Sequence, residues 1–446
     1  MIDATHASLT MTDIGRVMEK LQGLRGRLSP GEQAILDDLM RTAGVLEVSP
    51  PQYNPFLPNV HIDPYPHYHL IQSENPVHFS EAMQAWIVCR YDDVVDALRN
   101  PHLSYRTGLE AVQSLVPADE QSSIRAVSQF LTSLLNEIDP PDHTRLRVVM
   151  TRAMSTAIGV ETRERIQVIA NRLLDAVEPL GEMNIVVDFA NPLPAIVGAD
   201  LLGIPAADRD RFATFIHDVI HTFSQGFSGA PAMRQGEAAV TELTAYLASL
   251  LRERAEAPRT DMLSVLAKAT ELNDNERVLI AANIMMGMHE NLTHAISLTM
   301  RTLLSDAELG QWVRDHPEQA GIVVEEALRY EGTAPILSRR ATEDVTIGST
   351  TIPKGARVVL LIAAANRDVD HFDAPDCFVP NRRPNTHIAF GAGKRACPGS
   401  SLARSVLRVS LETLLSRFPS MRLLETEPAM REEINIRGLQ SLKVAL

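Results

Sequence analysis

The sequence predicts a mainly α-helical protein with a small β part. Apolar residues recur with helical periodicity through nearly all of the stretch from about residue 119 to 330, as in ERIQVIANRLLDAV and GEAAVTELTAYLASLLRERAEA. The alternation typical of strands is confined to a few short stretches. Hydrophobic residues make up 45% of the 446 positions, which is ample for a core, and no boundary is apparent after residue 60. We therefore expect one large domain over residues 61–446.

Residues 1–60 are expected to form a helical extension and a proline-rich linker. Segments such as MTDIGRVMEKLQGL have the periodicity of amphipathic helices. The stretch from Ser49 to Pro66 then carries six prolines, each of which lacks a backbone donor and has a fixed φ. We predict that this stretch is neither helix nor central strand and runs over the surface.

The strand candidates lie near Trp86 and after Asp344. WIVCRY, from Trp86 to Tyr91, alternates bulky and β-branched residues, and the following DDVVDALRN has the pattern of a short helix. DVTIGSTTI and ARVVLLIAAA, which begins at Ala356, are further strands with PKG as the turn between them. Long helices are predicted over residues 274–304 and after Pro398, in SLARSVLRVSLETLL.

Composition excludes several classes of protein. A net charge of −14 lacks the basic footprint of a general nucleic-acid binder. Three cysteines without CxxC spacing indicate neither a disulfide framework nor a zinc ribbon, and they fit a reducing cytoplasm. The N-terminus has no signal-peptide pattern, and VLIAANIMMGM from Val278, taken as the most apolar stretch, is too short to span a bilayer. We expect a cytoplasmic protein that binds no nucleic acid and spans no membrane.

One of the cysteines lies in a glycine-rich basic loop, HIAFGAGKRACPGSSLAR, at residues 387–404. Lys394, Arg395 and the start of the next helix favour a thiolate at Cys397, and glycines let the backbone approach a flat ligand closely. Two other interpretations of Cys397 stay open at this point. It can be a small buried hydrophobic residue, or a catalytic thiol whose histidine base the sequence does not place.

The pattern F-G-x-G-x-R-x-C-x-G, matched in full from Phe390 to Gly399, resembles the haem-binding loop of the cytochrome P-450 family, in its soluble bacterial class. The resemblance runs from about Asp63 to the end of the chain. It implies haem b between a long distal helix and the cysteine-loop helix, with Cys397 as the axial ligand of the iron. Phe390, Gly391 and Gly399 are then expected to contact the haem.

The same resemblance assigns structural and haem-binding roles to charged residues elsewhere. Glu326 and Arg329, three positions apart on one helix, match an E-x-x-R pair that joins an arginine before the loop, here Arg382 with Arg383 as a close second. Their implied role is to hold the loop against the core. The cations expected to bind the two haem propionates are His143, Arg147, Arg339, His387 and Arg395.

The oxygen-side helix departs from the family pattern. In MMGMHENLTHAISL, Gly287 takes the small position, Glu290 the acidic position, and Asn291 the place of the usual threonine. Thr293 lies roughly 200° further round the helix and is no simple substitute. An amide holds water but lacks the relay proton of a hydroxyl. Asn291 can position water, a substrate hydroxyl can complete the relay, or the enzyme can tolerate uncoupling or use peroxide; Glu290 is either the relay acid or a surface ion-pair partner.

The resemblance implies a monooxygenase that uses O2 to hydroxylate or epoxidise a lipophilic secondary metabolite, of polyketide or terpenoid type. The alternatives are a peroxide-using or non-hydroxylating member, which desaturates or forms rings, and a haem sensor or electron carrier. The few residues after Cys397 leave no room for a flavin domain, so electrons are expected from a ferredoxin or flavodoxin with an NAD(P)H-dependent reductase. Arg145, Lys394 and Arg404 would give that partner a basic face. The residues expected to line the substrate pocket are Gly287, Thr333, Ile336, Leu337, Leu439 and Gln440.

Overall fold

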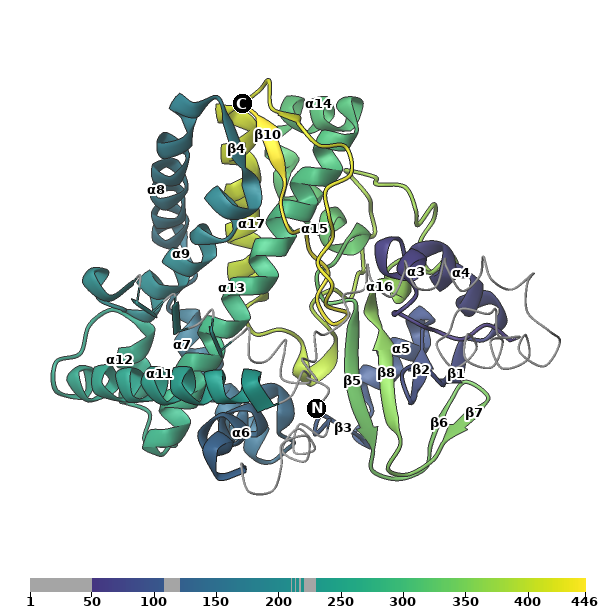
Figure 1. The fold of residues 1–446 in the computed structure, drawn as a ribbon, viewed down its shortest axis with the longest axis horizontal. Helices are drawn as coiled ribbons and strands as arrows, with labels where there is room; N and C mark the ends of the chain where they lie inside the picture. The colour runs from purple at the N-terminus through teal and green to yellow at the C-terminus, as the bar shows by residue number, and fades with distance from the viewer. Residues whose placement is uncertain (1–49, 108–120, 210, 213, 216–217, 220–229) are drawn as a thin grey trace, which may run out of the picture. The chain divides into compact units, whose positions relative to one another are not determined.

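The computed structural model describes residues 50–446 apart from 108–120, 210, 213, 216–217 and 220–229 (Figure 1). The chain groups into two compact units. Of the described residues, one unit contains 50–103 with Ala334–Asp376 and Glu432–Ile436, and the other contains those within Ser104–Thr333, Cys377–Arg431 and Arg437–Leu446. The helices expected in residues 1–49 lie outside the described residues, so the proposed extension over residues 1–60 stays a prediction.

The first unit is built on a five-stranded sheet in the order β1-β2-β8-β5-β3. Strand β2 runs parallel to β8, with Trp86 opposite Val358, and β5 runs antiparallel to β8, with Arg339 opposite the same residue. A separate hairpin joins β6 to β7. The elements of this unit are α3 (Pro58–Ile62), α4 (Tyr65–Glu74), β1 (Val77–Ser80), β2 (Ala85–Val88), α5 (Tyr91–Arg99), β3 (Leu103–Ser104), β5 (Ile336–Ala341), β6 (Val345–Ile347), β7 (Thr350–Ile352), β8 (Arg357–Leu361) and α16 (Ile362–Ala365).

Two predictions in this unit are wrong. Helix α3 lies inside the proline-rich stretch, because Pro58 occupies the first turn of the helix, where a missing N–H costs nothing. Strand β8 ends at Leu361, and the alanines after it form the short helix α16. Both β8 and α16 are buried, so the apolar run of this segment does not change where the strand becomes a helix.

The second unit is mainly helical, as predicted. Its long helices and the strands β4 and β10 are labelled in Figure 1, and its small sheet has the order β4-β10-β9. Its helices are α6 (Arg125–Ser133), α7 (Asp142–Ser155), α8 (Val160–Val177), α9 (Pro192–Leu202), α11 (Ala230–Glu256), α12 (Met262–Ala267), α13 (Asp274–Ser305), α14 (Ala307–Asp315), α15 (Ala320–Tyr330) and α17 (Ser400–Arg417), with short 3-10 turns at η3 (Gln121–Ile124), η4 (Leu135–Glu137), η5 (Glu178–Leu180), η7 (Ala206–Asp208), η9 (Pro317–Gln319) and η10 (Gly393–Arg395), and a π-helical turn at η6 (Ile185–Ala190). Its strands are β4 (Glu182–Asn184), β9 (Arg422–Leu423) and β10 (Lys443–Ala445).

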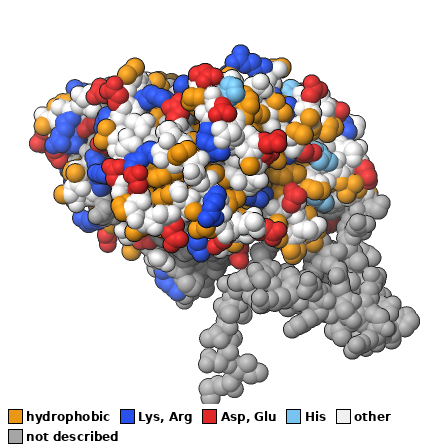
Figure 2. All heavy atoms as spheres, turned by 90° about the horizontal axis from the view of Figure 1, so that it is seen from above, with side chains coloured by type: hydrophobic (Ala, Val, Ile, Leu, Met, Phe, Trp, Pro, Cys, Tyr) orange, Lys and Arg blue, Asp and Glu red, His pale blue; other side chains and the backbone are white. Residues whose placement is uncertain are grey.

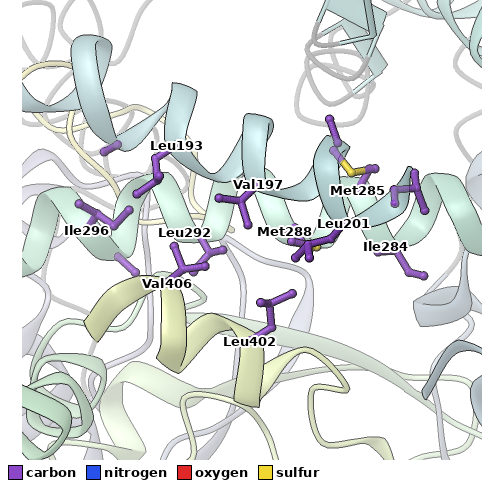
Figure 3. Packing of buried hydrophobic residues seen from close by; sticks show 14 of the residues in the cluster. Leu193, Val197, Leu201, Ile284, Met285, Met288, Leu292, Ile296, Leu402 and Val406 are labelled. Atoms are coloured by element: carbon purple, nitrogen blue, oxygen red, sulfur yellow. The ribbon is translucent and has the colours of Figure 1, made fainter. Parts of the chain in front are cut away.

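Helix α13 is the long central helix of this unit. It begins at a capping box, in which the Asn273 side chain accepts from the Glu276 backbone and the Glu276 side chain accepts from Asn273. Figure 3 shows its apolar side chains packed between those of α9 and α17. Met288 and Leu292 of α13 belong to the same buried cluster as Leu402 of α17. Core packing therefore joins the predicted oxygen-side helix to the helix that follows the cysteine loop.

The most apolar long segment is not the one chosen from sequence. Ile185–Leu202, which spans η6 and α9, has a mean hydropathy of 1.5 over 18 residues, enough in length and composition to cross a membrane. However, 61% of this segment is buried inside the protein, as in a core helix. On the face shown in Figure 2, Lys and Arg side chains lie among Asp and Glu side chains.

Candidate functional site

The cysteine loop is a tight backbone turn that ends at α17. Gly391 and Gly393 have φ of 70° and 69°, a region that strongly favours glycine. The Cys397 N–H donates to the Phe390 carbonyl at 2.8 Å, which closes the loop. A side chain at Gly399 would lie 3.8 Å from Cys397 Sγ and 3.2 Å from Met154 Cε, so glycine leaves the sulfur accessible. The glycines of the predicted motif therefore shape the backbone around Cys397.

The thiol of Cys397 lies in a mixed electrostatic environment. Desolvation by the surrounding protein raises the pKa of Cys397, and it outweighs the hydrogen bonds from the backbone of Gly399 and Ser400 and the charges of Arg147 and Arg404, which lower it. The Cys397 side chain is nevertheless exposed by surface area. A reachable sulfur with N–H donors and two guanidinium groups nearby suits a thiolate metal ligand, and the interpretation of Cys397 as a buried hydrophobic residue does not fit its exposure.

Three of the predicted haem-binding cations converge beside this loop. His143 and Arg147 lie one turn apart on α7, and an Arg147 Nη2 atom donates to the Ala396 carbonyl. Arg395 donates to the Ile138 carbonyl at 2.7 Å, and its guanidinium lies 3.5 Å from the centre of the Tyr105 ring. Burial, followed by the charges of Arg395 and Arg147, lowers the pKa of His143 to about 4. Near pH 7 His143 is therefore neutral beside two guanidinium groups, and an anion bound here would interact favourably with both of them.

These observations test whether the chain can hold a haem. Haem offers an iron that takes a soft axial ligand and two carboxylates that need cations, and the loop presents one exposed thiol beside three basic side chains. Among the described residues, no group of three or more His, Cys, Asp or Glu could hold a bare metal ion. The donor set fits an iron whose other ligands come from a porphyrin.

The two remaining predicted propionate ligands are placed differently. His387 Nε2 lies 3.1 Å from Glu325 Oε2, and its Nδ1 accepts from the Ala389 N–H at 3.2 Å. Arg339 lies in β5 of the first unit, is buried, and donates to the Ser338 carbonyl at 2.7 Å. Their roles as haem ligands stay predictions.

Glu325 was missed by sequence reasoning, and nothing in the local pattern distinguishes it from a surface carboxylate. Its Oε1 accepts from Arg404 Nε at 2.6 Å, and its Oε2 binds His387. Burial raises the pKa of Glu325, but hydrogen bonds and charges from His387 and Arg404 outweigh it and lower the pKa to about 2. The guanidinium of Arg404 also lies 4.6 Å from the centre of the Phe390 ring. This carboxylate ties the residues before and after the cysteine loop to α15.

Glu326 and Arg329 form a fully buried ion-pair network with Arg382. Glu326 Oε2 accepts from Arg329 Nε at 2.8 Å, and Glu326 Oε1 accepts from Arg382 Nε at 3.0 Å. The Val379 N–H adds a bond to Glu326 Oε1 at 2.8 Å, and both arginines also donate to the Cys377 carbonyl. Arg382 is buried, whereas Arg383 is exposed. The structure thus brings together the three predicted residues and selects Arg382 over Arg383.

The distal helix α13 places Glu290 and Asn291 half-buried, each bound to another segment. Glu290 Oε1 lies 3.5 Å from Arg431 Nη2, and Asn291 Oδ1 accepts from Thr333 Oγ1 at 3.2 Å. Thr293 is buried and donates to the His289 carbonyl of its own helix at 3.0 Å. Gly287 is exposed, and nothing lies within 4 Å of where its Cβ would be. The helix therefore has an open space beside Gly287, one turn before Asn291.

The predicted pocket residues are divided between the two units. Ile336 and Leu337 lie in β5 of the first unit. Leu439 is buried and pairs with Met430 in an isolated bridge, while Gln440 is exposed and donates to the Met430 carbonyl at 3.0 Å. Thr333 follows α15 and contacts Asn291. The structure thus brings Thr333 to the distal helix, whereas the pocket assignment of the other residues stays a prediction.

The predicted basic face is partly neutralised. Arg145 binds Glu276 at 2.6 Å and Asp142 at 3.4 Å, and Arg404 binds Glu325. Lys394 is exposed in η10. Of the three predicted cations, both arginines therefore have carboxylate partners within the protein.

Comparison with known proteins identifies close relatives. A family model described as Cytochrome P450 matches residues 321–441. Cytochrome P450 CYP107DY1 of Priestia megaterium is 35% identical over 374 residues, which cover 81% of this chain and 89% of that protein. The structure of P450BioI in complex with hexadec-9Z-enoic acid ligated acyl carrier protein is similar at a TM-score of 0.78 and 30% identity, covering 87% of this chain and 99% of that chain. The cytochrome P450 PksS of the Bacillus subtilis bacillaene polyketide synthase is similar at a TM-score of 0.77 and 29% identity, covering 89% and 100% of the two chains.

Proposed function

Because the chain belongs to the cytochrome P450 family of monooxygenases, we propose that it is a haem-thiolate enzyme that hydroxylates or epoxidises a lipophilic secondary metabolite. The observation that carries the proposal is the exposed thiol of Cys397, held in a glycine-shaped loop beside His143, Arg147 and Arg395. This arrangement combines a soft axial ligand with cations for two carboxylates. The cofactor we propose is haem b.

The residues of the chain hold the cofactor and manage protons around it. Cys397 would supply the thiolate that binds the haem iron, and the nearby N–H groups of Gly399 and Ser400 would stabilise its charge. The network of Glu326, Arg329 and Arg382 fixes the segment that leads into the loop. When bound, the haem supplies the iron at which O2 is reduced and from which one oxygen atom is transferred. Glu290 and Asn291 hold protons and water on α13, beside the open space at Gly287.

A carbon monoxide difference spectrum of the reduced protein tests this proposal. We expect the strongly red-shifted Soret band of a thiolate-ligated haem, and we expect Cys397→Ala to abolish it. A band at the usual position for carbon monoxide opposite histidine overturns the assignment of Cys397. A haem sensor or electron carrier would give the thiolate band but no oxidised product in a broad substrate screen with a competent reductase.

The replacement of threonine by Asn291 favours one alternative chemistry. No hydroxyl stands at position 291, and the hydroxyl of Thr293 is bound to its own helix. A peroxide-driven or non-hydroxylating enzyme needs no such relay. Product analysis with reductase and NAD(P)H against hydrogen peroxide separates the two. In the monooxygenase, Asn291→Thr raises the product formed per NAD(P)H if the amide is a weak substitute, and lowers it if the amide is adapted to its substrate.

The substrate class and partners complete the proposal. Among the similar structures, one holds an acyl chain on a carrier protein and another belongs to a polyketide synthase. These support a lipophilic substrate of polyketide type, with a terpenoid as the second class. We propose that a ferredoxin or flavodoxin with an NAD(P)H-dependent reductase donates electrons in the cytoplasm. A spin-shift screen of such compounds, followed by turnover with each redox partner, tests both assignments.

A further inference from the structure

Asn291 is held at one end of its side chain by a residue from another segment. Thr333 Oγ1 donates to Asn291 Oδ1 at 3.2 Å, across 42 residues of sequence. An amide oxygen only accepts hydrogen bonds and an amide nitrogen only donates them. Because Oδ1 is bound to Thr333, the groups of the Asn291 side chain that can bind a ligand are the two N–H donors of Nδ2.

Thr333 is itself fixed before it reaches Asn291. The Thr333 carbonyl accepts from the Arg437 N–H at 2.8 Å. The Arg437 side chain binds Glu331 at 2.8 Å, and both of these side chains are 9% exposed. The Thr333 backbone is therefore held by Arg437, while the Thr333 hydroxyl binds Asn291 on α13. Such support is what holds a polar group in one orientation.

An open space lies on the face of α13 that carries Asn291. Gly287 lies four residues earlier on α13, so the two residues share one face of the helix. Nothing lies within 4 Å of where a Gly287 side chain would be. An oxygen atom that enters this space can accept a hydrogen bond from Asn291. The threonine of the family pattern would instead offer it a hydroxyl, which can both donate and accept.

We propose that Thr333 is a positioning residue that turns Asn291 into a fixed hydrogen-bond donor for an acceptor oxygen beside α13. The oxygen belongs to water or to a carbonyl or ether of the substrate, which share this chemistry. The inference rests on the proposed function, because the oxygen is one that takes part in the reaction at the haem. It adds a specific requirement to that function: the oxygen of the substrate or water accepts a hydrogen bond from Asn291 and does not need to donate one.

The test compares Thr333→Val with Thr333→Ser in the haem-loaded enzyme. The first readout is the infrared stretch of carbon monoxide bound to the reduced haem, because a donor close to its oxygen lowers the stretching frequency. We expect one narrow band in the wild type and in Thr333→Ser. In Thr333→Val we expect a broadened band shifted to higher frequency, as in Asn291→Leu. Thr302→Val is the matched control. The Thr302 hydroxyl lies on α13, as Asn291 does, and donates to the Leu298 carbonyl of its own helix.

A second readout identifies the source of the oxygen. The probes are cyclododecanone and cyclododecane, which differ in one acceptor oxygen, and the measurement is the dissociation constant from the spin shift. If the amide binds a substrate oxygen, the constant for the ketone rises about three- to tenfold in Thr333→Val and that for the hydrocarbon does not, as expected for one lost hydrogen bond. If it binds water, both constants change alike and the infrared shift remains. Either result supports the proposal.

The inference is overturned if Thr333→Val keeps the narrow wild-type band and the wild-type preference between the two probes. A thermal unfolding midpoint equal to that of Thr302→Val shows that the fold is intact in that case. Failure of the proposed function looks different, because the wild type itself would then lack the red-shifted carbon monoxide band.

Discussion

The carboxylates of Glu326 and Glu290 are bound in opposite ways. Glu326 is fully buried and accepts bonds from Arg329, Arg382 and the Val379 N–H. Glu290 is half-buried and faces Arg431 at 3.5 Å, where Arg431 is 33% exposed. The first arrangement has no freedom, because removing any member leaves a buried charge. The second pair is longer, and although the Glu290 side chain is only 13% exposed, its partner Arg431 reaches solvent, so the pair is held less firmly.

The largest effect is expected from Glu326→Gln. The change leaves two buried guanidinium groups without their counter-charge, and breaking a buried pair in this way costs about 3–5 kcal/mol. Urea unfolding measures the loss, and haem content per protein is expected to fall with it. The control is Glu412→Gln, whose partners Arg163 and Arg408 are 39% and 43% exposed. That exposed network is worth about 0–1 kcal/mol. Equal losses in the two variants would contradict the contrast.

Glu325 is expected to make stability fall in acid. Its folded pKa of about 2 lies below the ordinary value of 4.5, so the stabilisation is complete above pH 4.5 and is lost as the pH falls toward 2. Glu325→Gln removes this part of the pH dependence. Urea midpoints between about pH 7 and about pH 3 measure it. Glu425→Gln, which removes an exposed pair with Lys443, is expected to keep the wild-type slope.

Arg431→Gln tests the Glu290 half of the comparison between Glu326 and Glu290. The ion pair with Glu290 is partly exposed, so its loss is expected to change stability by about 0–1 kcal/mol. The release of Glu290 is expected to alter the yield of product per NAD(P)H. Comparison of coupling with the urea midpoint separates these effects. A loss of stability as large as that of Glu326→Gln, with unchanged coupling, would show that Arg431 belongs to the scaffold.

Gly287→Ala is the one variant expected to raise stability, and the gain is small. The added methyl group meets no atom within 4 Å, and alanine in place of glycine inside a helix stabilises by about 1 kcal/mol. The same methyl group reduces the open space beside Asn291, so the spin shift with bulky ligands is expected to weaken. A thermal midpoint and a ligand titration check both expectations. A variant that is destabilised would mean that this space is filled in the folded protein.

The sequence predicted the features that are contiguous and left out those that depend on distant contacts. The turn from Phe390 to Gly399 and the spacing of Glu326 and Arg329 are local, so pattern and resemblance were enough to find them. The partners of Glu290 and Asn291 come from segments far along the chain, Arg431 and Thr333, and no periodicity indicates such pairs. The strand that becomes α16 was misjudged because a buried apolar run has the same composition in both states.

Gly438, next to the bridge between Met430 and Leu439, limits which positions near the C-terminus can be engineered. A side chain at this position would lie 2.2 Å from Nδ1 of His294, on the turn of α13 that follows Asn291. The neighbouring Gln440 is exposed, and its side chain donates to the Met430 carbonyl at 3.0 Å. A library built to change the substrate range should therefore keep glycine at position 438, because any side chain there would collide with the His294 ring on α13.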